Sequence, residues 1–463
     1  MYKRRNSSVV RVGNVMIGGS NPVRIQSMAN TSTMDTEASV AQAERIVQAG
    51  GEIVRFTTQG QREALNMKAI AEALRAHGCD VPLVADVHFN PAVADTAAAI
   101  CEKVRINPGN YVDPGRKFRH IDYTDQEYAD EIRKIDERFV PFINICKEHH
   151  TAIRIGVNHG SLSDRIMSRY GDTPEGMVES CMEFLRICVR EQFHDVVISI
   201  KASNTVVMVT TVRLLVAQMD KEGMAFPIHL GVTEAGEGED GRIKSAVGIG
   251  ALLCEGIGDT IRVSLSEPPE NEIPVARKLV EMTTECAELR EQAKAEIKDD
   301  TITISLHETC WEDLQLKAAM TVGALLIDRL ATKLVICNEG FTEQKLRQLA
   351  DDILQAARVK FTKTEYISCP GCGRTLYNLE QTIQRIKQAV NAMAADNPKF
   401  RTLKIGIMGC IVNGPGEMAD ADYGYVGAAV GKVSLYKGKV CIEKNIPEDQ
   451  AVDKLIQLIL TDA

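Results

Sequence analysis

Residues 228–266, IHLGVTEAGEGEDGRIKSAVGIGALLCEGIGDTIRVSLS, contain the unit from which the first part of the chain is built. A run rich in aliphatic residues begins at Ile228 and ends in polar residues around Glu234, and a second such run begins at Asp259. Between the two runs lies a segment with helical spacing that ends at glycines, as helix C-termini commonly do. A strand, a helix and a second strand in this order predict a βαβ unit with parallel strands.

The same unit recurs over the first 266 residues. Eight aliphatic runs that end in polar residues begin at Pro22, Glu52, Pro82, Lys103, Ala152, Asp195, Ile228 and Asp259. Helical segments such as TEASVAQAERIVQAG separate the runs. Eight strands alternating with helices predict a (β/α)₈ TIM barrel over residues 1–266. An open doubly wound sheet is the alternative, but the count of eight and the length favour a closed barrel. Residues 1–20 are expected to form a hairpin that turns at Gly13–Asn14 and covers the barrel bottom.

The pattern changes after residue 266, where EPPENEIP is typical of a linker. Charged helical sequence, a strand candidate (TITISL) and a helix–strand–helix segment follow. We interpret residues 267–363 as an α/β insert of unclear role. Residues 364–463 alternate again and predict a small α/β domain with two cysteine motifs on loops at strand ends. The whole chain is therefore predicted to be of the α/β class, in three parts.

Composition excludes several classes of protein. The 463 residues are 44% hydrophobic and 25% charged, the usual balance of a soluble globular protein. The formal net charge of −9 argues against a general nucleic-acid or membrane-surface binder. No run approaches the roughly 18 apolar residues of a membrane span, and the N-terminus lacks the apolar region of a signal peptide. We therefore expect a cytoplasmic protein, in which local basic sites for an anionic small molecule remain compatible with the charge.

Most of the thirteen cysteines give no sign of special chemistry. An odd number in a long chain without a signal peptide does not suggest a disulfide framework. Six that stand singly in apolar surroundings are expected to be small buried hydrophobic residues: Cys101, Cys146, Cys181, Cys188, Cys254 and Cys337. Cys441, in KVCIEK, is expected to be strand core.

Three other cysteines lie on glycine-rich loops. CPGC supplies Cys369 and Cys372, and MGCIVNGPGE supplies Cys410. Thiolates on such loops are typical of iron–sulfur clusters, whereas a structural zinc site requires four ligands. We therefore favour a [4Fe–4S] cluster, with a zinc site and reactive thiols as alternatives. Three thiolates leave one iron open, and Glu417 is the nearest candidate ligand, unless it is only a solvated loop charge.

Five cations are expected at the carboxyl ends of five barrel strands, where TIM barrels carry their sites. They are Arg55, Arg105, Arg154, Lys201 and Arg262, and the polar residues near them are Asn107, Asn158, Ser203, Thr233 and Ser264. Cations that converge in a protein of net negative charge indicate a polyanionic ligand, because guanidinium groups bind phosphate in a bidentate manner. The alternative is that each arginine pairs with a barrel carboxylate such as Asp86.

Three residues at the same strand ends are candidates for moving protons. Glu234 is the carboxylate of the seventh strand, and Asp86 and His88 lie on the third. Asp86 lies deeper and is expected to orient its neighbours.

Together, these motifs resemble the IspG/GcpE family of 4-hydroxy-3-methylbut-2-enyl diphosphate synthases. The resemblance is carried by CPGCGR and MGCIVNGPGE together with LVADVHF, VRINPGN, IRIGVNHGSL, ISIKASN, LGVTEAG and GDTIRVSLS. It covers residues 1–266 and 364–463. It implies a reductive ring opening of 2-C-methylerythritol 2,4-cyclodiphosphate to the linear allylic diphosphate in the methylerythritol phosphate route to isoprenoids. Two electrons from ferredoxin or flavodoxin would enter through the cluster, and one water would leave.

The resemblance also implies a role for each candidate residue. The cluster ligands would be Cys369, Cys372, Cys410 and Glu417. The cyclic diphosphate would be held by Arg55, Arg105, Arg154, Lys201 and Ser264, helped by Asn158 and Arg262, and we add Ser203 to this set. Glu234 would donate a proton near the departing hydroxyl group.

The segment 267–363 departs from the family pattern. It is too long for the short linker of two-domain members and too short for the complete second barrel-like domain of others. In two-domain relatives the cluster of one subunit caps the barrel of the other, which makes a homodimer possible here.

Two rival functions remain at this stage. The first is an iron–sulfur electron carrier or scaffold with a structural barrel, against which the five cations argue. The second is a barrel lyase or pterin-type transferase that uses the phosphate site alone, against which the three cysteines argue.

Overall fold

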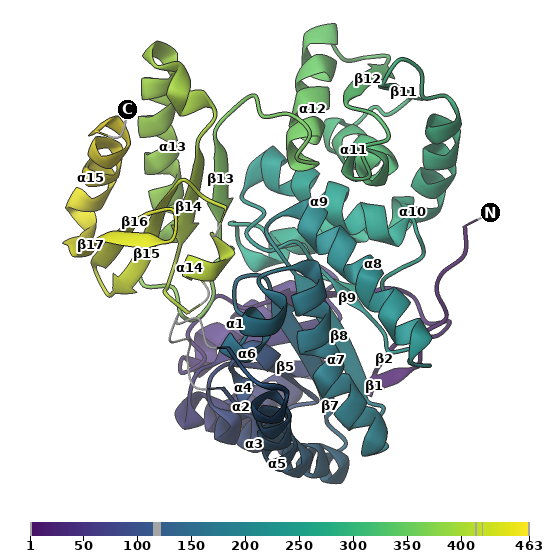
Figure 1. The fold of residues 1–463 in the computed structure, drawn as a ribbon, viewed down its shortest axis with the longest axis vertical. Helices are drawn as coiled ribbons and strands as arrows, with labels where there is room; N and C mark the ends of the chain where they lie inside the picture. The colour runs from purple at the N-terminus through teal and green to yellow at the C-terminus, as the bar shows by residue number, and fades with distance from the viewer. Residues whose placement is uncertain (1, 114–121, 413, 419, 462–463) are drawn as a thin grey trace.

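The computed structural model describes residues 2–113, 122–412, 414–418 and 420–461. It has three parts, with the N-terminal barrel below, the C-terminal domain at the upper left and the insert at the upper right of Figure 1. No helix in the described ranges is long and apolar enough to cross a membrane. Asn413, which begins the NGPG turn of the second cysteine motif, lies outside the described residues.

Eight parallel strands form the barrel. Their order in the sheet is β8-β7-β6-β5-β4-β3-β10-β9. The bounds are β3 (Arg24–Met28), β4 (Ile53–Thr58), β5 (Leu83–Val87), β6 (Lys103–Ile106), β7 (Ala152–Asn158), β8 (Val196–Lys201), β9 (His229–Leu230) and β10 (Thr260–Ile261). A parallel bridge between Ile198 and Ile228 joins β8 to the start of β9 and closes the sheet on itself. The predicted TIM barrel, with its eight strands, is confirmed.

Eight helices follow the eight strands. They are α1 (Thr36–Gln48), α2 (Gln61–Ala76), α3 (Pro91–Ala98), α5 (Asp125–His149), α7 (Pro174–Arg190), α8 (Thr205–Lys221), α9 (Gly238–Leu253) and α10 (Glu272–Ala295), with the short α4 (Pro108–Tyr111) and α6 (Asp164–Tyr170) added. Asn90, Thr173 and Asn204 cap α3, α7 and α8, because their side chains accept the first free backbone N–H groups. The eighth barrel helix, α10, lies within the segment interpreted from sequence as the insert.

The N-terminal hairpin closes the barrel at its amino end. Strands β1 (Val10–Val12) and β2 (Val15–Ile17) pair antiparallel, as the Gly13–Asn14 turn predicts. Val10, Val12 and Ile17 pack in one buried cluster with the lowest inward residues of four barrel strands, which are Ile53, Val84, Ala152 and Val197. The ligand-binding end of the barrel is therefore the opposite, carboxyl end.

The insert is packed onto the barrel and does not form a separate core. It contains the parallel strands β11 (Thr301–Leu306) and β12 (Lys333–Asn338) and the helices α11 (Trp311–Ile327) and α12 (Glu343–Ala356). Helix α11 is pressed so closely against α9 that a Cβ atom on Gly323 would lie 2.9 Å from the Val247 carbonyl oxygen. Buried residues of the barrel and of the insert form one continuous hydrophobic cluster.

The C-terminal domain is a mixed sheet with two helices packed on it. Its strands are β13 (Glu365–Ser368), β14 (Lys404–Met408), β15 (Tyr423–Ala429), β16 (Lys432–Lys437) and β17 (Val440–Pro447), and its helices are α13 (Leu379–Asp396), α15 (Glu448–Thr461) and the short α14 (Gly414–Glu417). Strands β13 and β14 are parallel neighbours, so Cys369 and Cys410, which follow them, lie at the same edge of the sheet. The predicted position of the cysteine motifs at strand ends is confirmed.

Two expectations about cysteines are wrong. Cys337 is exposed on β12, because the alternation of this strand puts it on the face that no helix covers. Cys441 lies on β17, whose residues are mostly exposed, so it is half-buried at a sheet edge and not in a strand core. The other five cysteines expected to be buried are buried.

Candidate active site between the barrel and the C-terminal domain

A cavity lies between the carboxyl ends of the barrel strands and the two cysteine loops. Its lining from the barrel consists of Met28, Arg55, Asp86, Arg105, Arg154, Asn158, Lys201, Thr233, Glu234, Arg262 and Ser264. The C-terminal domain contributes Cys369, Cys372, Arg374 and Cys410 together with loop residues around them. The structure thus brings the predicted cations and the predicted thiols to one enclosed space.

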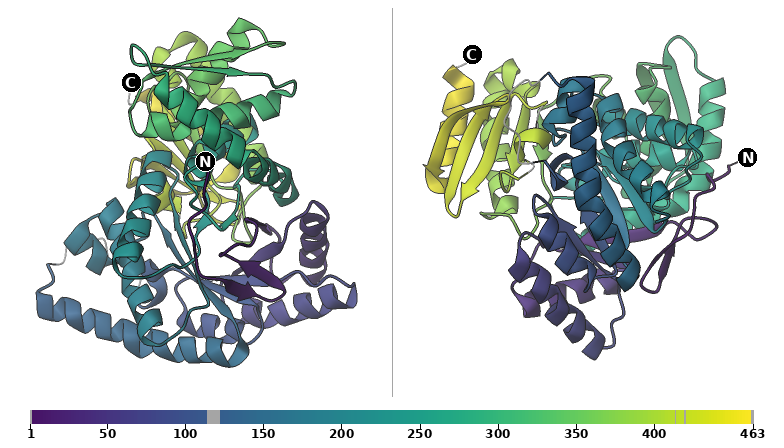
Figure 2. Two further views of the ribbon diagram at one scale, coloured as in Figure 1. Left: turned by 90° about the vertical axis from the view of Figure 1, so that its right-hand side faces the viewer. Right: turned by 60° about the horizontal axis from the view of Figure 1, so that its bottom comes forward.

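The C-terminal domain caps the barrel of its own chain (Figure 2). A parallel backbone bridge joins Ala235 to Ser368, and the Lys244 ammonium group lies 3.0 Å from the Glu365 carboxylate. Gly160 and Gly416 meet face to face, because a Cβ atom on Gly160 would lie only 2.3 Å from the Gly416 carbonyl oxygen. These contacts join the cap to the barrel within one chain.

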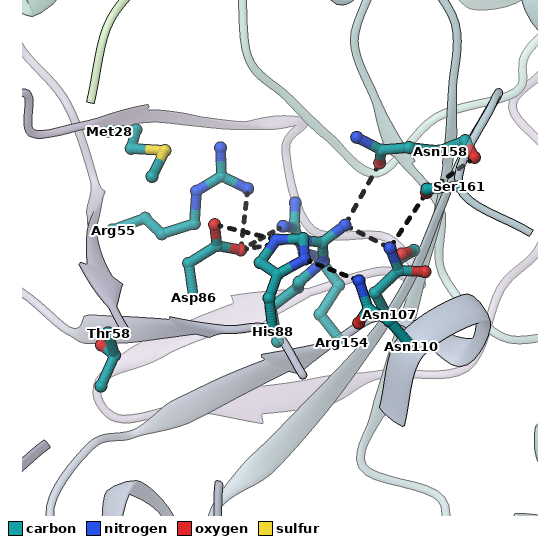
Figure 3. Close-up of polar contacts among 12 residues, drawn as sticks. Met28, Arg55, Thr58, Asp86, His88, Asn107, Asn110, Arg154, Asn158 and Ser161 are labelled. Atoms are coloured by element: carbon teal, nitrogen blue, oxygen red, sulfur yellow. Dashed lines mark hydrogen bonds and ion pairs between the residues drawn. The ribbon is translucent and has the colours of Figure 1, made fainter. Parts of the chain in front are cut away.

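Asp86 lies at the centre of the cations (Figure 3). Its carboxylate oxygens lie 3.1 Å from Arg105, 3.6 Å from Arg154 and 3.9 Å from Arg55. Burial alone would raise the pKa of Asp86, but the Arg105 and Arg55 guanidiniums hold it well below its usual value. One carboxylate is therefore shared by several arginines, and pairing with barrel carboxylates satisfies the cations only in part.

Several buried donors in this cluster have no partner. The Nε and Nη1 atoms of Arg154 and the Nε atom of Arg105 make no hydrogen bond with the described protein atoms. Burial, followed by the neighbouring Arg55 and Arg105 charges, lowers the pKa of Arg154 well below its usual value. Buried donors without acceptors cost about 1–3 kcal/mol each. An anion rich in oxygen atoms would relieve this cost.

Arg262 differs from the other predicted cations. Its guanidinium forms a bidentate pair with Glu272, at 2.8 and 2.9 Å, at the start of α10. Burial opposes the charge, but the Glu272 carboxylate more than compensates and raises the pKa of Arg262. Arg262 therefore lines the cavity with its charge already neutralised.

The three loop cysteines all line the cavity, on buried or half-buried loops. The Gly409 backbone N–H donates to Cys369 Sγ at 3.2 Å, and the Cys372 N–H donates to Thr375 Oγ1 at 3.0 Å. Gly371 takes the left-handed φ of 78° that the tight CPGC turn requires. Among the described residues, no three His, Cys, Asp or Glu side chains converge on a single ion position. Three thiols on glycine-rich loops are a donor set of the kind that holds iron–sulfur clusters.

Glu417 and Glu234 meet at the domain boundary. Glu417 accepts hydrogen bonds from Asn158 Nδ2 at 2.6 Å and from Thr233 Oγ1 at 2.8 Å. The Glu417 carboxyl lies close to that of Glu234, and burial, together with the proximity of the other carboxyl, raises the pKa of Glu417 well above its usual value. Burial likewise raises the pKa of Glu234. Burial therefore favours the protonated form of both carboxyl groups.

Sequence models of two domain families match the chain. The GcpE TIM-barrel domain matches residues 7–277, and the GcpE protein C-terminal domain matches residues 365–461. The chain belongs to the GcpE family.

Named relatives of the GcpE family agree with this assignment. The chain is 53% identical to a protein of Phocaeicola vulgatus named 4-hydroxy-3-methylbut-2-en-1-yl diphosphate synthase (flavodoxin), over 99% of this chain and 98% of that protein. It is 51% identical to a protein of the same name from Bacteroides thetaiotaomicron, over 100% and 98%. These alignments span 607 and 609 positions against the 463 residues here, so the relatives carry residues that this chain lacks.

A likeness to solved structures is much weaker. The N-acetylneuraminic acid synthetase of Leptospira borgpetersenii serovar Hardjo-bovis covers 64% of this chain and 95% of its own, with 13% identity and a TM-score of 0.39. At this level the likeness supports no functional argument. Membership of the GcpE family, in contrast, confirms an oxidoreductase of isoprenoid biosynthesis and does not favour an electron carrier.

Of the remaining predicted residues of this GcpE-family site, some line the cavity and others do not. Ser264 lines the cavity, whereas Ser203 lies outside its lining and donates to the Glu417 carbonyl oxygen at 3.0 Å. His88 contacts Arg105, and burial together with the Arg105 charge lowers its pKa to about 3. A neutral His88 is suited to holding Arg105 in place and is a poor acid at neutral pH.

Sequence reasoning missed Arg374. This residue lines the cavity and its Nη2 lies 3.0 Å from Asp86 Oδ2, across the domain boundary. The signal that could have found it is its position two residues after Cys372, since a cation beside a thiolate motif has an electrostatic reason to be there.

Proposed function

We propose that this chain catalyses the reductive ring opening of 2-C-methyl-D-erythritol 2,4-cyclodiphosphate to 4-hydroxy-3-methylbut-2-enyl diphosphate, with electrons delivered through a [4Fe–4S] cluster. The observation that carries the proposal is the shared cavity, which places a cluster of cations opposite three loop cysteines. An anion site and a thiolate site in one enclosed space suit a substrate that is both a diphosphate and an electron acceptor.

The barrel residues would hold the diphosphate. Arg55, Arg105, Arg154 and Lys201 supply the charge, and Ser264 and Asn158 supply neutral hydrogen bonds. The unpartnered nitrogen atoms of Arg154 and Arg105 support this role, because phosphate oxygens would satisfy them. Arg262 would contribute less, since Glu272 already neutralises it.

The cysteine loops would hold the cluster through Cys369, Cys372 and Cys410. When bound, the cluster supplies the two electrons of the reduction. Glu417 is the proposed fourth ligand, and its carboxylate accepts hydrogen bonds from Asn158 and Thr233 that would help to position it.

Glu234 would hold the proton that the departing hydroxyl group needs. Its buried carboxyl lies at the domain boundary between the cation cluster and the cysteine loops, and burial raises its pKa, which favours the protonated form. Transfer of that proton allows the oxygen to leave as water.

Flavodoxin, named for the relatives, or ferredoxin is the proposed electron donor. We propose that the protein acts in the cytoplasm, where such soluble donors are found. Because the cap and the barrel come from one chain, a homodimer is not required to complete the site.

The test is turnover by anaerobically reconstituted protein with reduced flavodoxin and the cyclic diphosphate. We expect iron and sulfide in stoichiometric amounts, a broad charge-transfer band in the visible spectrum, and the linear diphosphate detected by phosphorus NMR. A colourless protein that binds zinc at the cysteines, or an iron-loaded protein that leaves the cyclic diphosphate unchanged, would refute the proposal.

A further inference from the structure

Two buried basic side chains, Lys103 and His229, lie inside the barrel below the cation cluster, and the proposed reaction uses neither. Their neighbours Val104 and Leu230 pack in the hydrophobic cluster between the barrel and its helices, so strand alternation turns Lys103 and His229 inward. Both side chains are fully buried. Lys103 Nζ and both ring nitrogens of His229 make no hydrogen bond with the described protein atoms. The layer beneath the proposed anion site thus holds polar groups that its own neighbours do not satisfy.

The surroundings of Lys103 are apolar or cationic. Val84 and Ala152 lie beside it on the neighbouring strands and belong to the apolar cluster that the N-terminal hairpin closes. The charges that face it are the guanidiniums of Arg154 and Arg55. Burial first, and then these guanidiniums, lower the pKa of Lys103 well below its usual value. The neutral amine is therefore favoured as long as no anion offsets the arginines.

His229 faces the same cations. The charges around it are those of Lys201, Arg154, Arg55 and Lys103, and burial is the larger cause that lowers the pKa of His229 well below its usual value. A lysine amine is intrinsically far more basic than an imidazole, with a pKa of about 10.4 against about 6.5 in model peptides. Of the two groups, Lys103 is thus the first to accept a proton when negative charge arrives.

We propose that Lys103 is a positioning residue that takes up a proton from solvent when the cyclic diphosphate binds, and so adds a positive charge beneath the anion. The inference rests on the proposed function, since it takes this anion to bind at the barrel cations. A bound dianion offsets the charges of Arg154 and Arg55, which oppose a further charge on Lys103. Attraction between opposite charges is strong in a buried site of low dielectric. Because binding takes up a proton, affinity falls as pH rises through the range in which Lys103 is neutral without the ligand and charged with it.

Calorimetry of the oxidised, cluster-loaded protein with the cyclic diphosphate measures this uptake. Without a reductant the ligand is bound and not converted. Its phosphate groups carry only strongly acidic oxygens, so the ligand itself exchanges no proton near neutral pH. Titrations in buffers of different ionisation enthalpy give the number of protons taken up. The wild type should take up about one proton at neutral pH, and its affinity should fall by up to about tenfold for each unit of rising pH.

Lys103→Met removes the titrating group at similar volume. Proton uptake should disappear, and affinity at neutral pH should be about tenfold weaker, within the usual range of coupling between sites. Without ligand, the variant should unfold at a higher urea concentration, because an unpaired buried amine is replaced by an apolar group. The matched control is Lys317→Met. Lys317 on α11 is also buried but is paired with Glu285 and Glu308, so its loss should lower stability and leave proton uptake unchanged.

Three results would overturn the proposal alone. The first is undiminished proton uptake in Lys103→Met, which would place the proton on another group such as His88 or His229. The second is a wild type that binds the cyclic diphosphate without proton uptake. The third is a lower urea midpoint in Lys103→Met, as a merely structural lysine would give. If Lys103→Met does not fold, Lys103→Gln, which also holds no proton, provides the same comparison. A wild type that does not bind the cyclic diphosphate at all would instead refute the proposed function, and this inference with it.

Discussion

At the scale of single residues, partners decide which predicted cations are available to a ligand. Arg154 and Arg262 are both buried and were both expected at strand ends, but Arg154 is the third residue of β7, whereas Arg262 directly follows β10. In the structure Arg154 retains unpartnered nitrogen atoms, whereas Arg262 is held by Glu272. Glu272 could not be foreseen as a partner because it lies in a segment that is typical of a linker.

This difference predicts opposite effects of two alanine substitutions. Arg154→Ala should weaken binding of inorganic diphosphate by about 1.5–3 kcal/mol, the value of hydrogen bonds to charged groups, with little loss of stability. Arg262→Ala should instead lower the free energy of unfolding by about 3–5 kcal/mol, because Glu272 is left as an uncompensated buried charge. Calorimetry and urea unfolding of both variants check the pair. Equal losses of affinity in the two variants would contradict the distinction.

Glu234 carries a prediction about pH. Its pKa is raised, so the protonated form that donates is present below the raised pKa and is lost as pH rises through it. The turnover number should therefore fall on the alkaline side, and Glu234→Gln should lower turnover by about two to four orders of magnitude. Diphosphate affinity serves as the control and should be kept. Normal turnover in Glu234→Gln would remove it from the mechanism.

At the scale of elements, the sequence predicts the strands and helices well. It predicts poorly which other elements pack against them. The eight barrel strands follow from local runs of aliphatic residues, and the two cysteine motifs follow from their positions after β13 and β14. Cys337 was wrongly placed, because the aliphatic pattern of β12 does not say that only one of its faces is covered. Glu234 and Glu417 approach each other across two domains, so the local sequence around either residue cannot predict their proximity.

The cysteine loops predict a clear division among four variants. Cys369→Ser, Cys372→Ser or Cys410→Ser should each remove most of the iron, because three thiolates leave none to spare. Cys441→Ser should keep the cluster, since Cys441 lies on β17 and outside the cavity lining. Iron and sulfide analysis after anaerobic reconstitution gives the result. Full iron content in Cys410→Ser would show that this residue is not a ligand.

The packing of α11 on α9 predicts a loss of stability in Gly323→Ala. Alanine is favoured over glycine in a helix by about 1 kcal/mol, but overpacking costs about 1–3 kcal/mol. The neighbour is the Val247 backbone carbonyl, which cannot rotate away, so the overpacking term should prevail. Thermal unfolding should show a lower midpoint. An unchanged or higher midpoint would show that the two helices can separate at little cost.

At the scale of the whole molecule, the chain brings its own C-terminal domain onto its own barrel. The fold class and the two end domains could be predicted, because each follows from patterns within it. The capping arrangement could not, because domain orientation depends on contacts such as Lys244 with Glu365 and Gly160 with Gly416, which are distant in sequence. The central claim is that one chain supplies both halves of the active site.

Mixing two inactive variants tests that claim most directly. Cys410→Ser lacks the proposed cluster site and Lys201→Ala lacks a proposed diphosphate ligand, and each alone should have little turnover of the cyclic diphosphate. If each chain caps its own barrel, an equimolar mixture should show only the sum of the two residual activities. Recovery in the mixture of about a quarter or more of wild-type turnover, as random exchange of caps between two chains would give, would contradict the account.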